Sequence, residues 1–202
     1  MNIKRFESFN KDILIVVDVQ KSFSKFFTKR YVSEVKKYCE SFDIVYQIFD
    51  NHHEGQSDSN YLYHEYPELD NLDDIYHFPN VKEVIEKRYN YNVNVDFYKK
   101  ILSKDLYTKI SKLEKSNNIR RGDYFKTNEG TIIVYIGNNH KWFHVPLKLF
   151  KILNNNIGKR VYIIGGSNSE CLDDVYISGL SLGVNIIKDN RYIYSATNCP
   201  IK

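Results

Sequence analysis

Cysteine, proline and glycine are scarce in this chain. Its 202 residues include three cysteines, four prolines and nine glycines. So few cysteines, in an odd number, argue against a disulfide-stabilised scaffold and indicate a reducing compartment, so we expect a cytoplasmic protein. The composition also excludes a collagen-like chain, and no stretch rich in proline, glycine or serine marks a linker between domains.

Long apolar runs are absent as well. A run such as Ile13 to Val17 falls far short of the roughly 20 residues that a membrane-spanning helix needs. The first residues lack the apolar core and small-residue cleavage site of a signal peptide, so we expect no contact with a membrane. Hydrophobic residues at 42% and charged residues at 27% are typical of a globular protein, and we expect a single domain over residues 1–202.

Charge is weak overall but unevenly placed. The net charge of +4 is too small to imply a nucleic-acid partner by itself. Between Tyr98 and Lys126, however, nine Lys or Arg residues accompany three Asp or Glu residues. Such a stretch could contact phosphates, but it is more typical of the solvated face of a helix, so we expect no nucleic-acid partner.

Runs of β-branched residues alternate with amphipathic segments along the chain. We predict strands over 13–17, 43–49, 84–89, 130–137, 160–166 and 184–188. We predict helices over 29–40, 96–113, 146–154 and 171–182, a hairpin that joins 130–137 to 141–145, and a long irregular loop over 50–72. Strands that alternate with helices predict an α/β domain with a mostly parallel sheet.

Reactive side chains follow several of the predicted strands, at the edge where parallel sheets bind ligands. Cys171 matters most, because it follows two glycines and begins a helix. Unpaired backbone N–H groups and the helix dipole are expected to lower its pKa and favour the thiolate, and the glycines would let the backbone approach a substrate. The alternative is a small buried hydrophobic residue, which is also what we expect of Cys39.

Three segments together resemble the isochorismatase-like cysteine hydrolases, a family that includes the nicotinamidases. Residues 18–23 read Asp-Val-Gln-Lys-Ser-Phe, similar to the family's D-x-Q-x-x-F opening. Residues 161–172 and 183–189 resemble its nucleophile segment, and residues 86–89 fall where it has a catalytic lysine. The resemblance covers about 11–100 and 145–190, and it leaves about 112–144 as an inserted β-hairpin segment. It implies a three-layer αβα sandwich with a mostly parallel central sheet.

The resemblance also implies residue roles. Cys171 would be the nucleophile, and Asp18 would accept and return its proton. Lys87 would be the cation that stabilises the Asp18 carboxylate and the Cys171 thiolate. The backbone N–H groups of Ser167 and Cys171 would form the oxyanion hole, beside a cis bond between Gly166 and Ser167. A substrate pocket near Gln20 and Phe23 would complete the site.

A metal site is a further implication of the nicotinamidase resemblance. Asp50, Asn51 and His52 fit the D-x-H spacing, and His64 could be the third ligand. One carboxylate and two imidazoles suit Zn²⁺, Mn²⁺ or Fe²⁺. His53 could equally be the ligand, or the histidines of this acidic segment could bind nothing.

The chain departs from the family pattern at several positions. Asn168 stands where the family often has Thr, Asn51 replaces a usual Trp, and the segment after Lys87 lacks the usual Ser-Ala-Phe. We therefore predict a cysteine-dependent hydrolase of a small amide, with nicotinamide as the leading substrate and isochorismate as a weaker one. The resemblance also implies a homo-oligomer. The alternative is a non-catalytic relative that binds a ligand in the same pocket or a protein through the inserted hairpin.

Overall fold

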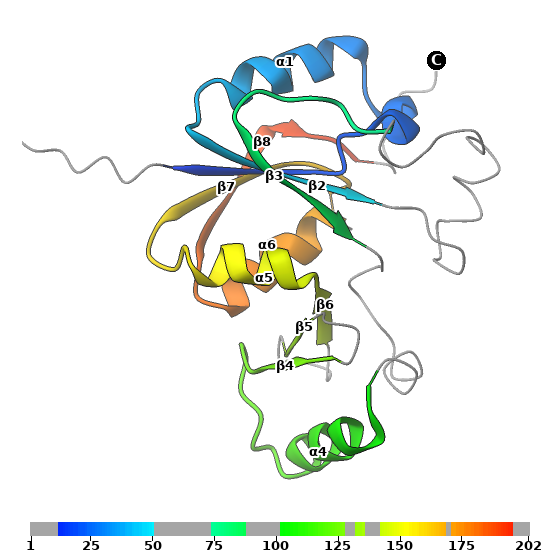
Figure 1. Ribbon diagram of the computed structural model, residues 1–202, viewed down its shortest axis with the longest axis vertical. Helices are drawn as coiled ribbons and strands as arrows, with labels where there is room; N and C mark the ends of the chain where they lie inside the picture. The colour runs from blue at the N-terminus through cyan, green and yellow to red at the C-terminus, as the bar shows by residue number, and fades with distance from the viewer. Residues whose placement is uncertain are drawn as a thin grey trace, which may run out of the picture.

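A five-stranded parallel sheet forms the centre of this computed structural model, which describes residues 12–50, 74–87, 102–127, 132–135, 142–168 and 171–195. The strands lie in the order β3-β2-β1-β7-β8, and every pair of neighbours is parallel (Figure 1). Their bounds are β1 Ile13–Val17, β2 Ile44–Asp50, β3 Val81–Lys87, β7 Arg160–Gly165 and β8 Asn185–Ile193. The predicted α/β fold with a mostly parallel sheet is confirmed.

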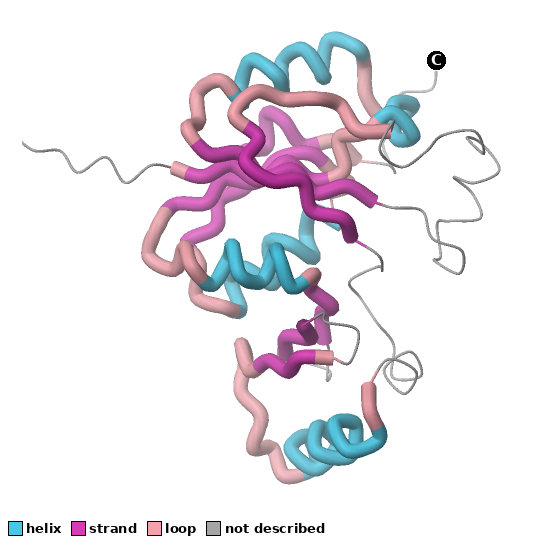
Figure 2. Tube along the Cα trace, in the orientation of Figure 1, coloured by secondary structure: helices cyan, strands magenta, loops and turns pink. Residues whose placement is uncertain are grey.

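Helices cover both faces of this sheet, as Figure 2 shows. Every residue of β1 is buried, because alternate side chains pack into different cores: Leu14 and Val16 on the α1 side, Ile13 and Ile15 on the other. The covering helices are α1 (Lys29–Cys39) on one face and α5 (Leu147–Asn154) with α6 (Cys171–Ser181) on the other. The predicted αβα sandwich is therefore present.

Local sequence explains several element ends. Thr28 caps α1, since its hydroxyl accepts a hydrogen bond from the Tyr31 N–H at 3.2 Å. Pro146, expected in the first turn of its helix, is instead the N-cap of α5. The strand predicted over 184–188 extends to Ile193, and the short 3₁₀ helix η1 (Lys21–Phe26) was not predicted. The predicted loop over 50–72 lies, beyond Asp50, outside the described residues.

A second, antiparallel sheet packs against the sandwich. It consists of β4 (Tyr124–Lys126), β5 (Ile132–Tyr135) and β6 (Trp142–Val145), and the predicted pairing of the last two is confirmed. Ile132 and Val134 of β5 join the core under α5 and α6, whereas Ile133 packs with Ile110 of α4 (Lys104–Lys115). This sheet and α4 thus add two layers below the sandwich (Figure 1). The insertion predicted over about 112–144 lies within this region.

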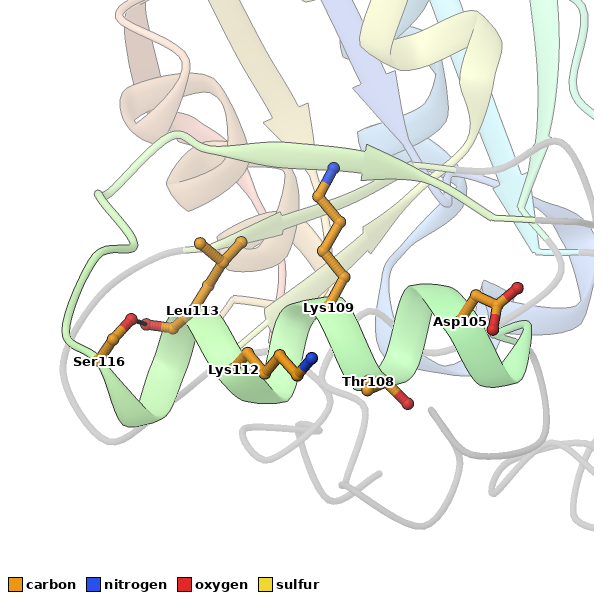
Figure 3. A pocket seen from close by; sticks show the side chains of 6 residues that line it. All are labelled: Asp105, Thr108, Lys109, Lys112, Leu113 and Ser116. Carbon is orange, nitrogen blue, oxygen red and sulfur yellow. Dashed lines mark hydrogen bonds between the residues drawn. The ribbon is translucent and has the colours of Figure 1, made fainter.

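A shallow hollow of about 420 Å³ runs along α4. Figure 3 shows Lys109 and Leu113 pointing toward the small sheet, whereas the Lys112 side chain runs along the helix toward Thr108. The Lys109 ammonium lies 5.6 Å from the centre of the Phe125 ring. The two lysines therefore do not converge on one ligand. Within the described ranges, no helix is both long and apolar enough to span a bilayer.

Candidate active site

Asp18 follows the central strand and is held firmly by its backbone. Its φ of +50° lies in the left-handed region, which aspartate tolerates better than most residues. The Asp18 N–H donates to the Ile48 carbonyl at 2.9 Å, and the Tyr194 hydroxyl donates to the Asp18 carbonyl at 2.7 Å. The carboxylate is thereby presented at the carboxyl edge of the sheet, the place predicted for it.

Lys87 ends β3 and is the largest side chain that is fully buried among the described residues. Its ammonium forms an ion pair with the Asp18 carboxylate and lies 3.5 Å from Oδ2 of Asp50. Both carboxylates are also 99% buried. A charge buried this deeply is tolerated only when it is paired, so the three side chains form one electrostatic unit. The sequence predicted the Asp18–Lys87 pair, and the structure adds Asp50 to it.

Cys171 is the first residue of α6 and lies within the electrostatic reach of this unit. Burial raises the pKa of its thiol well above the ordinary value; the Lys87 ammonium lowers the pKa, whereas Asp18 and Asp50 raise it. The predicted direction was therefore wrong, because burial outweighs the effect of the Lys87 cation.

This pKa leads to an expectation for alkylation. We expect iodoacetamide to modify Cys171 faster than Cys39, because the reagent can reach the partly exposed Cys171 but not the buried Cys39. Since only the thiolate reacts, the rate at Cys171 should still be rising at pH 9 instead of levelling off near pH 7. Peptide mass spectrometry after timed quenching measures both rates. A plateau below pH 8 would contradict the raised pKa.

Two glycines at the end of β7 allow close packing within the protein. Gly165 has a φ of +103°, and a Cβ there would lie 2.0 Å from the Val17 carbonyl oxygen. A Cβ on Gly166 would lie 2.6 Å from ring atoms of Tyr194. The glycines thus let this segment pack against β1 and Tyr194. The sequence had suggested another role for them, which was to let the backbone approach a substrate. The bond between Gly166 and Ser167 is cis, as the family resemblance implied.

We expect Gly166→Ala to destabilise the protein by about 1–3 kcal/mol, the usual cost of overpacking a core. Tyr194 cannot move aside freely, because its ring packs 5.0 Å from that of Phe27 and its hydroxyl holds Asp18. Chemical denaturation measures the loss. Repeating the substitution in a Tyr194→Leu background is the control, since the clashing ring atoms are then absent. An equal loss in both backgrounds would rule out this contact as the cause.

Gln20, predicted to lie near a substrate pocket, connects the ends of two strands. It is fully buried, and its side chain forms hydrogen bonds with both main-chain groups of Asp50. The Asp50 N–H donates to Oε1 of Gln20 at 2.8 Å, and Nε2 of Gln20 donates to the Asp50 carbonyl at 3.1 Å. The same amide donates to Asp74, whose carboxylate also accepts from the N–H and hydroxyl of Ser22, both at 2.6 Å. Gln20 therefore joins the ends of β1 and β2. Phe23 is half-buried on η1 with its ring 6.2 Å from that of Phe26.

The oxyanion-hole residues are only partly defined. Ser167 is described and 7% exposed, and its carbonyl accepts from the Leu172 N–H at 3.3 Å. The N–H of Cys171 lies in the first turn of a helix, where backbone donors lack an intrahelical acceptor. Residues 169 and 170 between them lie outside the described residues. The donor pair stays a prediction.

The predicted metal site is only partly described. Asp50 faces the Lys87 ammonium, while His52 and His64 lie outside the described residues. Within the described ranges, no three His, Cys, Asp or Glu side chains are close enough together to hold a metal ion. The metal site therefore stays a prediction. Elemental analysis of protein purified without chelator tests the prediction: about one transition metal ion per chain would support it, and none after reconstitution would refute it.

Tyr194 and Asp74 support the site but were not predicted from the sequence. Tyr194 contacts a residue 176 positions earlier, and Asp74 contacts Gln20 across 54 positions. Nothing local distinguishes Tyr194 from the chain's other tyrosines or Asp74 from the other acids near it. Only the sheet order, which places β1 between β2 and β7, brings them together.

Comparisons with known proteins add little to this description. No protein-family model matches the chain, and no curated protein matches it. Among solved structures, it is similar to a nicotinamidase from Staphylococcus aureus, with 16% identity and a TM-score of 0.39 over 92% of this chain and 86% of the other. A likeness this distant carries no weight for function. The α/β assignment rests on the parallel sheet and its two helical layers.

Proposed function

We propose that the chain is a cysteine-dependent hydrolase of small amides, with nicotinamide as the first substrate to test. One observation carries the proposal: the buried Asp18–Lys87 ion pair lies beside the thiol of Cys171 at the start of α6. A buried lysine is costly to a fold unless it is paired. Here it lies among a thiol and two carboxylates, where it can stabilise an anion that forms during a reaction.

The first half of the reaction forms a thioester. The Asp18 carboxylate takes the proton from Cys171 Sγ as the sulfur attacks the amide carbon, and the carbonyl oxygen becomes an oxyanion. The Lys87 ammonium offsets the negative charge on the sulfur while the proton moves. We assign the backbone N–H groups of Ser167 and Cys171 to the oxyanion. When the C–N bond breaks, Asp18 returns its proton to the leaving amine, which for a primary amide is ammonia.

The second half hydrolyses the thioester. Asp18, now unprotonated, takes a proton from water as the water oxygen attacks the thioester carbon. Collapse of this intermediate breaks the C–S bond, and the sulfur regains a proton from Asp18. The products are a carboxylic acid and the resting enzyme. The raised pKa of Cys171 fits this cycle, because the thiol begins and ends it protonated.

Ammonia release from nicotinamide, benzamide and acetamide tests the proposal. We expect Cys171→Ala to fold as the natural chain does and to lose all turnover. Cys39→Ala is the matched control, since Cys39 is buried on α1, far along the chain from the site, and should leave turnover unchanged. Equal turnover in Cys171→Ala and the natural chain would refute the nucleophile.

A pocket that binds small amides without hydrolysing them is the second candidate. The raised pKa of Cys171 is equally consistent with this candidate, because a buried cysteine used only for packing would show the same direction of shift. Calorimetric binding of nicotinamide without release of ammonia from any amide tested would select this candidate over the hydrolase.

A further inference from the structure

A cavity of about 560 Å³ opens at the amino edge of the parallel sheet, opposite the edge that carries Asp18 and Lys87. Its walls come from the first residues of β1, β2 and β3, and from α5 with the turn that follows it. Small-molecule sites in proteins commonly have volumes of about 300–1,000 Å³. This cavity is large enough for a ligand of one or two rings.

The cavity wall has an apolar part that belongs to the main core. Ile13 is 2% exposed and Ile152 is 7% exposed, and both pack in the cluster under α5 and α6. Ile44, at the start of β2, lies beside them. An apolar ligand group placed here would bury its surface on side chains that are already held in position.

Tyr46 gives this wall a polar group. It lines the cavity with 6% of its surface exposed, and no residue in the described ranges forms a hydrogen bond with its hydroxyl. The hydroxyl is not among the fully buried polar atoms of the described residues that lack a partner, so it reaches the open space of the cavity. A ligand oxygen in the cavity would provide a hydrogen-bond partner.

The rim carries an excess of positive charge. Of four lysines and one glutamate, Lys148 pairs with Glu83 at 3.0 Å. Lys82, Lys151 and Lys159 remain, and none forms an ion pair with another described residue. The last turn of α5 favours a cation such as Lys151, but it does not account for Lys82, which comes from β3. Three ammonium groups around one apolar wall attract an anion.

We propose that this cavity binds a small organic anion with an apolar body, such as an aryl carboxylate, sulfonate or phosphate ester. The apolar body would lie on Ile13 and Ile152, the Tyr46 hydroxyl would donate to an anionic oxygen, and Lys82, Lys151 and Lys159 would balance the charge. The proposal does not depend on amide hydrolysis, because the site lies at the opposite edge of the sheet.

Isothermal titration of the full chain with phenyl phosphate tests the proposal, with inorganic phosphate and benzyl alcohol as the charge-only and ring-only probes. We expect phenyl phosphate to bind at least about tenfold more tightly than either, because it uses both parts of the wall. Tyr46→Phe should weaken it about two- to tenfold, the value of one hydrogen bond. Lys151→Glu with Lys159→Glu should weaken it by about tenfold or more.

The matched control is Lys36→Glu with Lys37→Glu, two exposed positions on α1 across the sheet. It changes the net charge equally and should leave the Kd of phenyl phosphate unchanged. If both double variants weakened phenyl phosphate binding equally, the loss would come from the change in net charge and not from the cavity, and the proposal would be overturned. Equal Kd values for phenyl phosphate and inorganic phosphate, or no saturable binding, would also overturn it.

Discussion

Lys87→Met is expected to lower the free energy of unfolding by about 3–5 kcal/mol, the usual cost of removing one partner from a buried ion pair. The substitution keeps most of the side-chain volume, so a cavity explains little of the loss. It leaves the carboxylates of Asp18 and Asp50 buried together without their cation. Chemical denaturation followed by circular dichroism measures the change.

Two variants make this result specific. Lys82→Met places the same substitution at an exposed position on the same strand, and its stability should differ from that of the natural chain by less than about 0.5 kcal/mol. Adding Asp18→Asn and Asp50→Asn to Lys87→Met should restore part of the lost stability, because neutral amides then replace the two buried carboxylates. A loss below about 1 kcal/mol in Lys87→Met would show that the buried pair is not important for stability.

Asp18→Asn is expected to reduce amide turnover by about 10²- to 10⁴-fold, the usual contribution of a general acid–base group. Asparagine has nearly the same shape but cannot take the proton from Cys171. The fold should persist, because Asp50 remains as a partner for Lys87 and the backbone contacts of residue 18 do not involve its carboxylate. Initial rates of ammonia release measure the loss, with the best amide of the panel.

Asp12→Asn is the matched control for this substitution. Asp12 precedes the same strand at the opposite edge of the sheet and pairs with Arg160 at 2.8 Å on the surface. The change should leave turnover within about twofold of the natural chain, since a surface ion pair contributes little. If Asp18→Asn kept the natural rate, Asp18 would have no part in proton transfer, although Cys171 could still be the nucleophile.

The elements that the sequence predicts well are those whose burial is visible in local composition. The run Ile13 to Val17 is apolar throughout because β1 is buried on both faces, and such a run is readable without knowing its neighbours. β4 was not predicted, because Tyr124 to Lys126 is short and partly exposed and shows no apolar pattern. The packing of α4 on the small sheet also depends on distant contacts with Ile133.

The candidate site was predictable in position but not in electrostatics. Asp18, Lys87 and Cys171 each stand next to a strand or helix end, which the chain order reveals. The direction of the pKa shift at Cys171 could not be predicted from the sequence, because the burial of the thiol depends on how α6 packs over β7 and β8. The role of Gln20 likewise required knowledge that β2 lies beside β1, where it can bond Asp50.

The strand order also determines when the site comes into being during synthesis. β1 lies at the centre of the sheet, yet its pairing with β7 joins Ile13 to Val161, so one side of the central strand has no neighbour until most of the chain has emerged. Contacts this distant in sequence form slowly and leave apolar edges exposed meanwhile. Asp18 and Lys87 can meet early, but Cys171 joins them last. The growing chain therefore keeps one edge of β1 unpaired until β7 has been made, and the candidate site is complete only after α6 has followed.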